Sequence, residues 1–250
     1  MTEALAPGPI RTYVHRVKKD FSKPARPVSS EPAWCNSDNQ KTYYEVSPIE
    51  KVLAGFARMG GLDRGIDVDM VLPYLKTATR ILEAGPGYGR VLKRLLDHHL
   101  PGSIEAVERS QLLYKTLKPL QSKIKIFHSN ILDFRPSQLY DAVISMWSGI
   151  SDFAPSEQPQ FFYALANLLA PNGYLLMDTS CAWKKPLNAL SSSGQTYFII
   201  EEGCLVKGYI PNDHEMFAYA QQAGVSLRRC FLYRTATDRE RIMYVFQKLL

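Results

Sequence analysis

The chain has 250 residues, of which 46% are hydrophobic and 22% are charged. These proportions are typical of a globular protein of about one domain, and they exclude a collagen-like or largely disordered chain. Thirty Lys and Arg residues against 24 Asp and Glu residues give a net charge of +6, which suggests a polyanion such as nucleic acid as a partner. Six basic and two acidic residues fall within residues 1–30, so most of the excess charge lies in an N-terminal segment.

The cysteines and the N-terminus bear on compartment and cofactor class. Cys35, Cys181, Cys204 and Cys230 are far apart and form no CxxC pair, which argues against a zinc site and against a dense disulfide framework. No apolar block follows the first residues, and Pro171 and Gly173 interrupt the longest uncharged stretch. We therefore expect a cytoplasmic protein with no membrane span and no metal.

The first 78 residues divide into two expected segments. Pro, Ser and basic residues without sustained periodicity predict a flexible basic segment over residues 1–45. Apolar residues recur at helical spacing from Ile49 to Met59, until Gly60 and Gly61 end the pattern. Residues 46–78 are predicted to form a helical lid.

From residue 79 onward, short apolar runs alternate with amphipathic helices. This alternation predicts an α/β fold with a doubly wound, seven-stranded, mostly parallel sheet, and the last two runs predict an antiparallel C-terminal hairpin. Residues 180–211 break the alternation and are predicted to form an inserted hairpin after the fifth strand. The predicted strands are 80–84, 103–108, 123–128, 140–146, 174–178, 226–235 and 241–247. Residues 79–250 would thus form the main domain, with the insert within it.

A glycine-rich turn follows the first predicted strand in the sequence EAGPGYG, residues 83–89. Glycines allow a ligand to approach the backbone closely at the carboxyl end of a strand. The spacing differs from the dinucleotide fingerprint GxGxxG, and an acidic residue at Glu83 would repel a pyrophosphate. Glu83 instead suits a cationic group such as the ammonium of an amino acid, although it is also placed to cap the turn.

A second acidic residue, Glu108, ends the next predicted strand, nineteen residues after Gly89. A carboxylate there can accept hydrogen bonds from both hydroxyls of a ribose, or be a solvated strand end. The adjacent Arg109 can pack on an adenine ring or be solvated. The two carboxylates together predict a nucleoside that carries an amino-acid tail and no phosphates.

These landmarks resemble those of the class I (Rossmann-like) S-adenosylmethionine-dependent methyltransferases. The resemblance covers residues 79–247 and includes FHSNILDF at 127–134, YDAVISMW at 140–147 and LAPNGY at 169–174. Asn130 stands where the family usually has an aspartate, and its carbonyl can still accept from the adenine amino group. The cofactor implied is S-adenosylmethionine, with S-adenosylhomocysteine as product. The implied cofactor-binding residues are Glu83, Gly85, Pro86, Gly87, Gly89, Glu108, Arg109, Asn130, Ile131 and Met146.

The acceptor is less well defined by the sequence, and no residue is marked as a catalytic base. The fourth strand ends in SMWS, residues 145–148, and lacks the Asn/Asp-Pro-Pro-Tyr pattern of enzymes that methylate adenine N6 or glutamine. Each candidate for the acceptor pocket has a structural alternative, as a packing aromatic or a surface residue. The candidates are Tyr43, Tyr44, Trp147, Tyr197 and His214.

The favoured function is methyl transfer to a nitrogen or oxygen atom of a small molecule, because the lid and the insert would enclose a pocket. One alternative is an RNA or protein methyltransferase that uses the basic N-terminal segment as a recognition arm. Another is a non-catalytic module that binds S-adenosylmethionine. A closed pocket beside the methyl position would favour a small acceptor, whereas an open basic cleft would favour a polymer.

Overall fold

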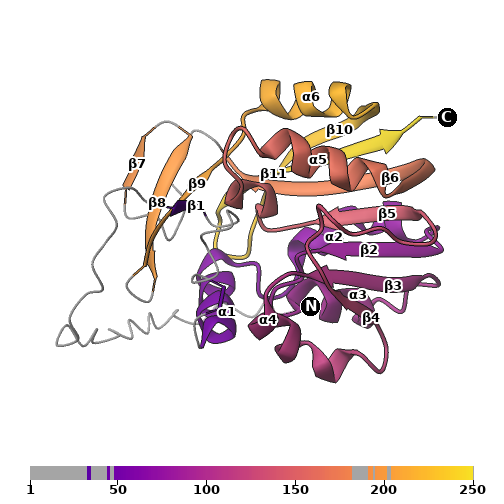
Figure 1. Cartoon of the computed structure of the whole chain (residues 1–250), viewed down its shortest axis with the longest axis horizontal. Coiled ribbons are helices and arrows are strands. Elements are labelled where there is room, and N and C mark those ends of the chain that lie inside the picture. The colour runs from indigo at the N-terminus through magenta and orange to yellow at the C-terminus, as the bar shows by residue number, and fades with distance from the viewer. Residues whose placement is uncertain are drawn as a thin grey trace, which may run out of the picture.

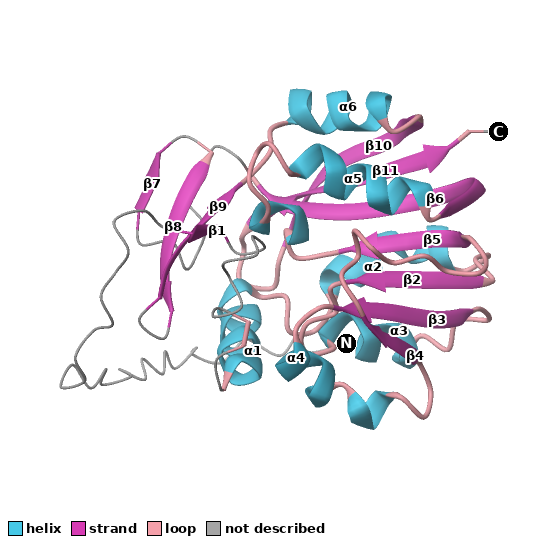
Figure 2. Cartoon of the chain, viewed as in Figure 1, coloured by secondary structure: helices cyan, strands magenta, loops and turns pink. Residues whose placement is uncertain are grey.

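A computed structural model describes residues 33–34, 44–45, 48–181, 191–193, 195–201 and 204–249. Its centre is a seven-stranded sheet with the strand order β10-β11-β6-β5-β2-β3-β4 (Figures 1 and 2). Six strands are parallel, and β11 runs antiparallel to both of its neighbours. The strands are β2 (Arg80–Ala84), β3 (Ser103–Glu108), β4 (Lys125–His128), β5 (Tyr140–Ser145), β6 (Leu169–Ser180), β10 (Val225–Arg234) and β11 (Glu240–Lys248). The predicted fold class, including the C-terminal hairpin, is confirmed.

Most strand bounds lie within two residues of the prediction, and β2 and β3 coincide with it. The exception is β6, which starts at Leu169 instead of residue 174. Leu169 pairs with Tyr140 before the register of the two strands shifts, and Asn172 lies in the left-handed region with φ 64°. Residues 171–173, which interrupt the uncharged stretch in the sequence, therefore form an irregularity within β6 and do not separate it from the preceding helix.

Helices cover both faces of this sheet. One face carries α2 (Ile66–Leu75) and α3 (Arg90–Asp97), with α4 (Gln111–Thr116) and the 3₁₀ turn η2 (Lys118–Leu120) beside them; the other carries α5 (Gln158–Asn167) and α6 (Asp213–Gln222). Helix α3 forms here because Val91, Leu92 and Leu95 recur on one side and are buried against β2 and β3. Among the described residues, no helix is long and apolar enough to cross a membrane.

Helix α1 (Ile49–Gly60) lies beside the carboxyl edge of the sheet and not over either face (Figure 1). It ends where Gly61 adopts φ 71°, as the glycine pair predicted. Thr237 in the β10–β11 turn donates a hydrogen bond to the carbonyl of Met59, so the end of α1 is joined to the C-terminal hairpin. Within the predicted 46–78 lid, α1 is thus at the sheet edge, whereas α2 packs into the core.

A second, smaller sheet stands next to this edge, with the strand order β1-β9-β8-β7 (Figure 2). Its strands are β1 (Ala33–Trp34), β7 (Ser191–Ser193), β8 (Thr196–Glu201) and β9 (Cys204–Tyr209). The antiparallel pair β8 and β9 is the predicted inserted hairpin, and β7 extends it. Strand β1 pairs in parallel with β9, so a piece of the predicted flexible 1–45 segment is part of a sheet.

The core on the α3 face provides a test of this architecture. Leu92 is fully buried, whereas Leu232 on the edge strand β10 is 55% exposed. We expect Leu92→Ala to lower the free energy of unfolding by about 2–5 kcal/mol, because it leaves a cavity between α3 and the sheet. The matched Leu232→Ala change should cost less than about 1 kcal/mol. Urea titration of both variants measures the difference, and similar losses would contradict the packing described.

Candidate functional site

A cavity of about 710 Å³ opens at the carboxyl ends of the parallel strands. Strands β2, β3 and β4 follow one another toward one side of the sheet, whereas β5 and β6 lie on the other side of β2. The chain therefore changes direction between β2 and β5, and loops that leave these strands diverge and open a crevice. Residues that follow all five strands line the cavity.

The glycine turn after β2 forms one wall. Gly85, Gly87 and Gly89 have φ values of 72°, 57° and 82°, which L side chains rarely adopt. A Cβ on Gly85 would meet no atom within 4 Å, so its backbone borders open space, whereas a Cβ on Gly89 would lie 2.8 Å from Leu117 Cδ2. Gly85 thus exposes backbone to the cavity, and Gly89 allows α3 to pack closely on the segment after α4.

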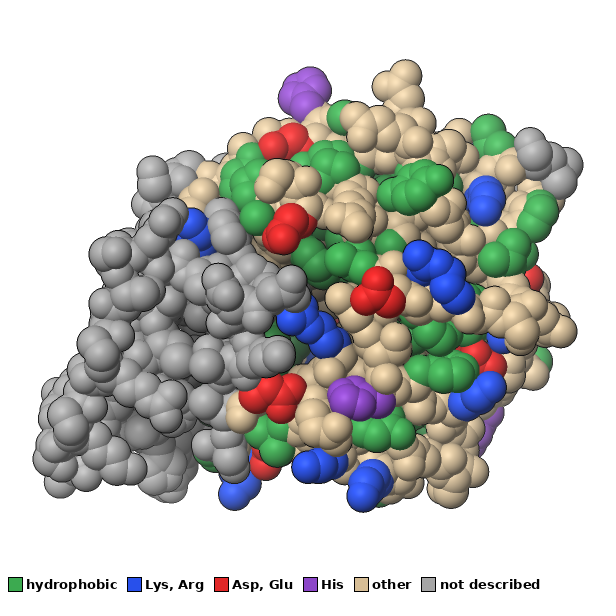
Figure 3. All heavy atoms as spheres, viewed as in Figure 1, with side chains coloured by type: hydrophobic (Ala, Val, Ile, Leu, Met, Phe, Trp, Pro, Cys, Tyr) green, Lys and Arg blue, Asp and Glu red, His purple; other side chains and the backbone are tan. Residues whose placement is uncertain are grey.

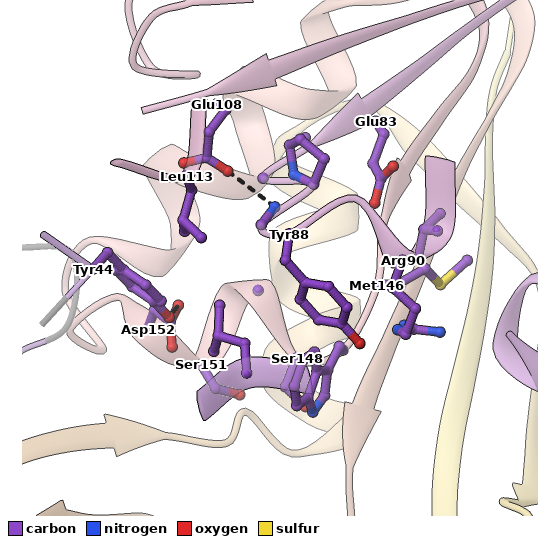
Figure 4. Close-up of a pocket in the computed structure, with 18 of the residues that line it drawn as sticks. Tyr44, Glu83, Tyr88, Arg90, Glu108, Leu113, Met146, Ser148, Ser151 and Asp152 are labelled. Carbon is purple, nitrogen blue, oxygen red and sulfur yellow. Dashed lines mark hydrogen bonds between the residues drawn. The ribbon is translucent and has the colours of Figure 1, made fainter. Parts of the chain in front are cut away.

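Glu108 ends β3 and is only 5% exposed. One of its oxygens accepts a hydrogen bond from the Gly87 N–H at 3.0 Å, the bond dashed in Figure 4, and the other accepts from the Ser110 N–H at 2.7 Å. Burial raises the pKa of Glu108 to about 7, although these N–H groups oppose the shift. The backbone N–H of Arg109 also lowers this pKa, and since a carboxylate has about four acceptor positions, these three N–H groups leave at least one position for a ligand.

Glu83 lies at the other side of the turn and is 2% exposed (Figure 4). Its Oε2 atom is buried and has no hydrogen-bond partner among the described residues. Burial raises the pKa of Glu83 to about 8, and Arg90 counteracts this only in part. The Arg90 guanidinium binds Asp67 through two bonds of 2.7 and 2.5 Å and the carbonyl of Leu62 at 2.8 Å, so it is committed elsewhere. A buried acid that lacks a partner is costly unless a cation arrives.

The other predicted cofactor residues mostly line the same cavity. Pro86, Arg109, Asn130, Ile131 and Met146 are there, and Gly89 alone of the predicted set does not line it. The side-chain carbonyl of Asn130 accepts from the Leu132 N–H at 3.1 Å, so this oxygen helps to shape the turn after β4. If this oxygen also accepts a hydrogen bond from adenine, as expected from the sequence, it accepts that bond in addition to the one from the Leu132 N–H.

Trp147 and Ser148, which follow β5, form another part of the wall. They adopt φ 57° and 61°, two successive left-handed conformations without glycine. A buried network holds them: Asp178 accepts from the Trp147 N–H through its side chain and from the Ser148 N–H through its carbonyl, and Arg241 donates to Asp178 and to Ser148 Oγ. The sequence analysis missed Asp178 and Arg241. The signal was a charged residue beside an apolar run, since Asp178 ends one run and Arg241 begins another.

Asp152 is another residue of the cavity wall that the sequence analysis missed. It ends the 3₁₀ turn η3 (Gly149–Asp152), lines the cavity and accepts a hydrogen bond from the Tyr44 hydroxyl. Figure 4 shows the two side chains facing each other at one end of the cavity. Burial raises the pKa of Asp152 to about 7, with Tyr44 opposing the shift. Tyr44 is fixed in turn by the Ser110 hydroxyl, which donates to its carbonyl at 2.9 Å.

The other three acceptor candidates either lie outside the cavity or have side chains that the structure does not describe. His214 is exposed at the start of α6 and does not line the cavity. Tyr197 belongs to β8, of which the structure describes the backbone alone at this position, and Tyr43 lies outside the described residues. Of the candidates whose side chains the structure describes, Tyr44 and Trp147 line the site and His214 does not. Groups of three or more potential metal ligands are absent from the described part of the chain.

Neither family models nor curated protein sequences match the chain. Solved structures match with 80% of this chain covered in each of three cases. An S-adenosylmethionine-dependent methyltransferase from Clostridium acetobutylicum has a TM-score of 0.61 at 12% identity, over 97% of its length. An amino pentose methyltransferase from Micromonospora echinaspora, with S-adenosylmethionine bound, has 0.60 at 13% identity over 97%. A 1,6-didemethyltoxoflavin-N1-methyltransferase from Burkholderia thailandensis has 0.58 at 10% identity over 86%. The chain therefore has the class I methyltransferase fold.

The buried Glu83 carboxyl makes the stability of the ligand-free protein depend on pH. Its pKa is near the ordinary 4.5 when unfolded and about 8 when folded, so the folded state holds an extra proton between these values and loses stability as pH rises through them. Glu83→Gln cannot ionise. We expect it to match the wild type within about 1 kcal/mol near pH 5 and to be more stable by roughly 2–4 kcal/mol at pH 9.

Urea unfolding of the two ligand-free proteins at several pH values checks this expectation. An advantage of Glu83→Gln that stays constant from pH 5 to pH 9 would show that Glu83 does not titrate in a water-poor site.

Proposed function

We propose that the protein is an S-adenosylmethionine-dependent methyltransferase that acts on a small-molecule acceptor. The observation that carries the proposal is the buried, unpartnered carboxylate oxygen of Glu83 beside a glycine turn that leaves open space at Gly85. The bound cofactor would supply a methyl carbon that its positively charged sulfur activates toward nucleophiles. The protein then has to bind, orient and shield the two reactants.

The residues present fit the groups of this cofactor. Glu83 offers a carboxylate to the ammonium of the methionine part, which would relieve the cost of its burial. Glu108 has acceptor capacity left for the ribose hydroxyls after its bonds to backbone N–H groups. Ile131 and Met146, 9% and 7% exposed, provide apolar surface on the cavity wall for an aromatic base.

The walls of the cavity support a small acceptor. Leu53 and Phe56 of α1, together with Tyr44, line the cavity from the side of the lid, and Cys181 and Ile210 line it at the two ends of the insert. Such walls exclude water from the reacting groups and limit the size of what enters. Two of the similar structures, an amino pentose methyltransferase and a methyltransferase of 1,6-didemethyltoxoflavin, bear names that denote small acceptors.

The charge distribution gives no support to a polymeric acceptor. On the face viewed in Figure 3, the described basic and acidic side chains are interspersed, without a continuous basic patch. Backbone-binding surfaces for nucleic acid gather Lys and Arg on one face. On this face, the described residues offer no such surface, and the basic residues 1–30 are the feature that would favour a nucleic-acid acceptor.

Cofactor binding can be separated from folding with one variant. Glu83→Gln, which we expect to be the more stable protein at pH 8, should bind S-adenosylhomocysteine about 10- to 100-fold more weakly, because the ammonium loses its charged partner. Isothermal calorimetry measures the dissociation constant. The control is Glu50→Gln, a glutamate of α1 that does not line the cavity, and it should bind as the wild type does. Unchanged affinity in Glu83→Gln would refute the assignment of Glu83.

A second, independent prediction concerns the affinity of a Glu108 variant for S-adenosylhomocysteine. Glu108→Ala removes the acceptor for the ribose hydroxyls and also frees the Gly87 and Ser110 N–H groups. We expect a loss of S-adenosylhomocysteine affinity of at least about 100-fold in calorimetry, from two charge-assisted hydrogen bonds. Circular dichroism establishes that the variant is folded, and a folded variant with wild-type affinity would sink the assignment.

The acceptor class is tested by the size of the methylated product. The protein is incubated with methyl-labelled S-adenosylmethionine and with three separate fractions of a cell extract: small metabolites, RNA and protein. We expect label in the small-metabolite fraction, and none when Glu83→Gln replaces the wild type at limiting cofactor. Label confined to RNA or protein would overturn the small-molecule proposal.

A further inference from the structure

Asp152 is an acidic residue of the cavity that binding of the cofactor does not explain. It is the last residue of η3, directly after the Trp147–Ser148 turn, and its carboxylate accepts the hydrogen bond of the Tyr44 hydroxyl across 108 residues of sequence. Glu83 and Glu108 lie around the glycine turn, whereas Tyr44 and Asp152 come from the lid side and from the loop after β5 (Figure 4). Asp152 thus places a carboxyl group in the cavity that is set apart from Glu83 and Glu108.

No cation compensates this carboxyl group within the described part of the chain. Tyr44 is its hydrogen-bond partner there, and Asp152 forms no ion pair. Strands β6 and β9 and helix α5 pack against η3. The titratable groups of these elements that could face Asp152 pair with other groups or are exposed. Asp178 binds Arg241, Tyr209 binds Glu215, and Tyr163 is exposed. The remaining group is Lys207, which has a partner of its own, and no ion pair joins it to Asp152.

The neighbouring Ser151 adds a second unmatched polar group. It is fully buried, lines the cavity, and its hydroxyl has no hydrogen-bond partner among the described residues. Buried polar groups are nearly always paired, so an unpaired hydroxyl next to an uncompensated carboxylate indicates that a ligand completes this end of the cavity. A protonated amine would bring both hydrogen-bond donors and the positive charge that the carboxylate lacks.

We propose that Asp152, oriented by Tyr44, holds the nitrogen of an amine acceptor and receives the proton that this nitrogen gives up. The inference rests on the proposed methyltransferase function and adds the class of acceptor. In the step, an N–H proton passes to a carboxylate oxygen of Asp152, and the nitrogen lone pair forms a bond to the methyl carbon. The S–C bond breaks, its electron pair stays on sulfur as a neutral thioether, and the product is an N-methylammonium.

The chemistry of Asp152 suits an amine better than a hydroxyl. Its pKa of about 7 lies roughly three units below that of an alkylammonium, about 10.4, and far below that of water, about 15.7. Proton transfer to a base is efficient when the two values are close. A phenol has a similar pKa to an ammonium, but it is neutral when it binds, whereas the charge of the ammonium is attracted to the Asp152 carboxylate.

Two ligands that share their nucleoside and amino-acid parts isolate Asp152. Sinefungin carries a primary amine at the position of the transferred methyl group, whereas S-adenosylhomocysteine has no group there. We expect Asp152→Asn to weaken sinefungin about tenfold and S-adenosylhomocysteine by less than about twofold in calorimetry at pH 8.5. The control, Asp133→Asn, removes an exposed aspartate outside the cavity and should leave both constants unchanged.

The pH dependence of the sinefungin preference gives a second readout. The ratio of the two dissociation constants should favour sinefungin above pH 7 and lose that preference below it, as Asp152 takes up a proton. Effects of Glu83 and Glu108 cancel in the ratio, because both ligands present the same groups to them. Tyr44→Phe should move the midpoint to higher pH, since the Tyr44 hydroxyl lowers the pKa of Asp152.

One set of results would contradict the amine proposal, and a different result would contradict the proposed methyltransferase function. Equal losses for both ligands in Asp152→Asn would assign Asp152 to the cofactor and overturn the amine proposal, and so would a sinefungin preference that is unchanged by the substitution. Failure of the wild-type protein to bind S-adenosylhomocysteine would instead overturn the proposed function itself.

Discussion

Two carboxyl groups, Glu83 and Glu108, are buried at the carboxyl edge of a parallel sheet, and neither forms an ion pair with a described residue. The guanidinium of Arg90, which opposes the pKa shift of Glu83 only in part, is bound to Asp67 and Leu62. Burial therefore holds the pKa values of both acids above their ordinary range. In the proposed function, this cost is recovered when a cationic ligand enters. Pre-organised charge of this kind favours binding over the stability of the free protein.

The opposite wall of the cavity depends on a buried network that reaches far along the chain. Asp178 on β6 and Arg241 on β11 hold the left-handed Trp147–Ser148 turn through its backbone and a hydroxyl. The Tyr233 hydroxyl of β10 also donates to Asp178, at 2.7 Å. The antiparallel C-terminal hairpin is thus more than an edge of the sheet, since it fixes the loop that leads to Asp152.

The sequence defined the parts of this protein that follow from local pattern. Apolar runs placed β2 and β3 at their observed bounds, and the acids before and after the glycine turn were identified because strand ends converge at one edge of a parallel sheet. The Tyr44–Asp152 contact and the Asp178–Arg241 pair join residues 108 and 63 positions apart, and no periodicity signals such pairs. Strand β1 was missed because a two-residue strand has no pattern of its own, and its pairing with β9 is a tertiary event.

Proton exchange on ligand binding tests the central claim, that buried neutral acids become carboxylates when the cation binds. Calorimetry of S-adenosylhomocysteine at pH 7, in buffers of different ionisation enthalpy, counts the protons exchanged. Because the pKa of Glu83 in the ligand-free protein is about 8, we predict that binding releases close to one proton or more per ligand at pH 7. The release should be smaller in Glu83→Gln, and little proton release should occur above pH 9. A binding heat that does not depend on the buffer, or a net uptake of protons, would contradict the account.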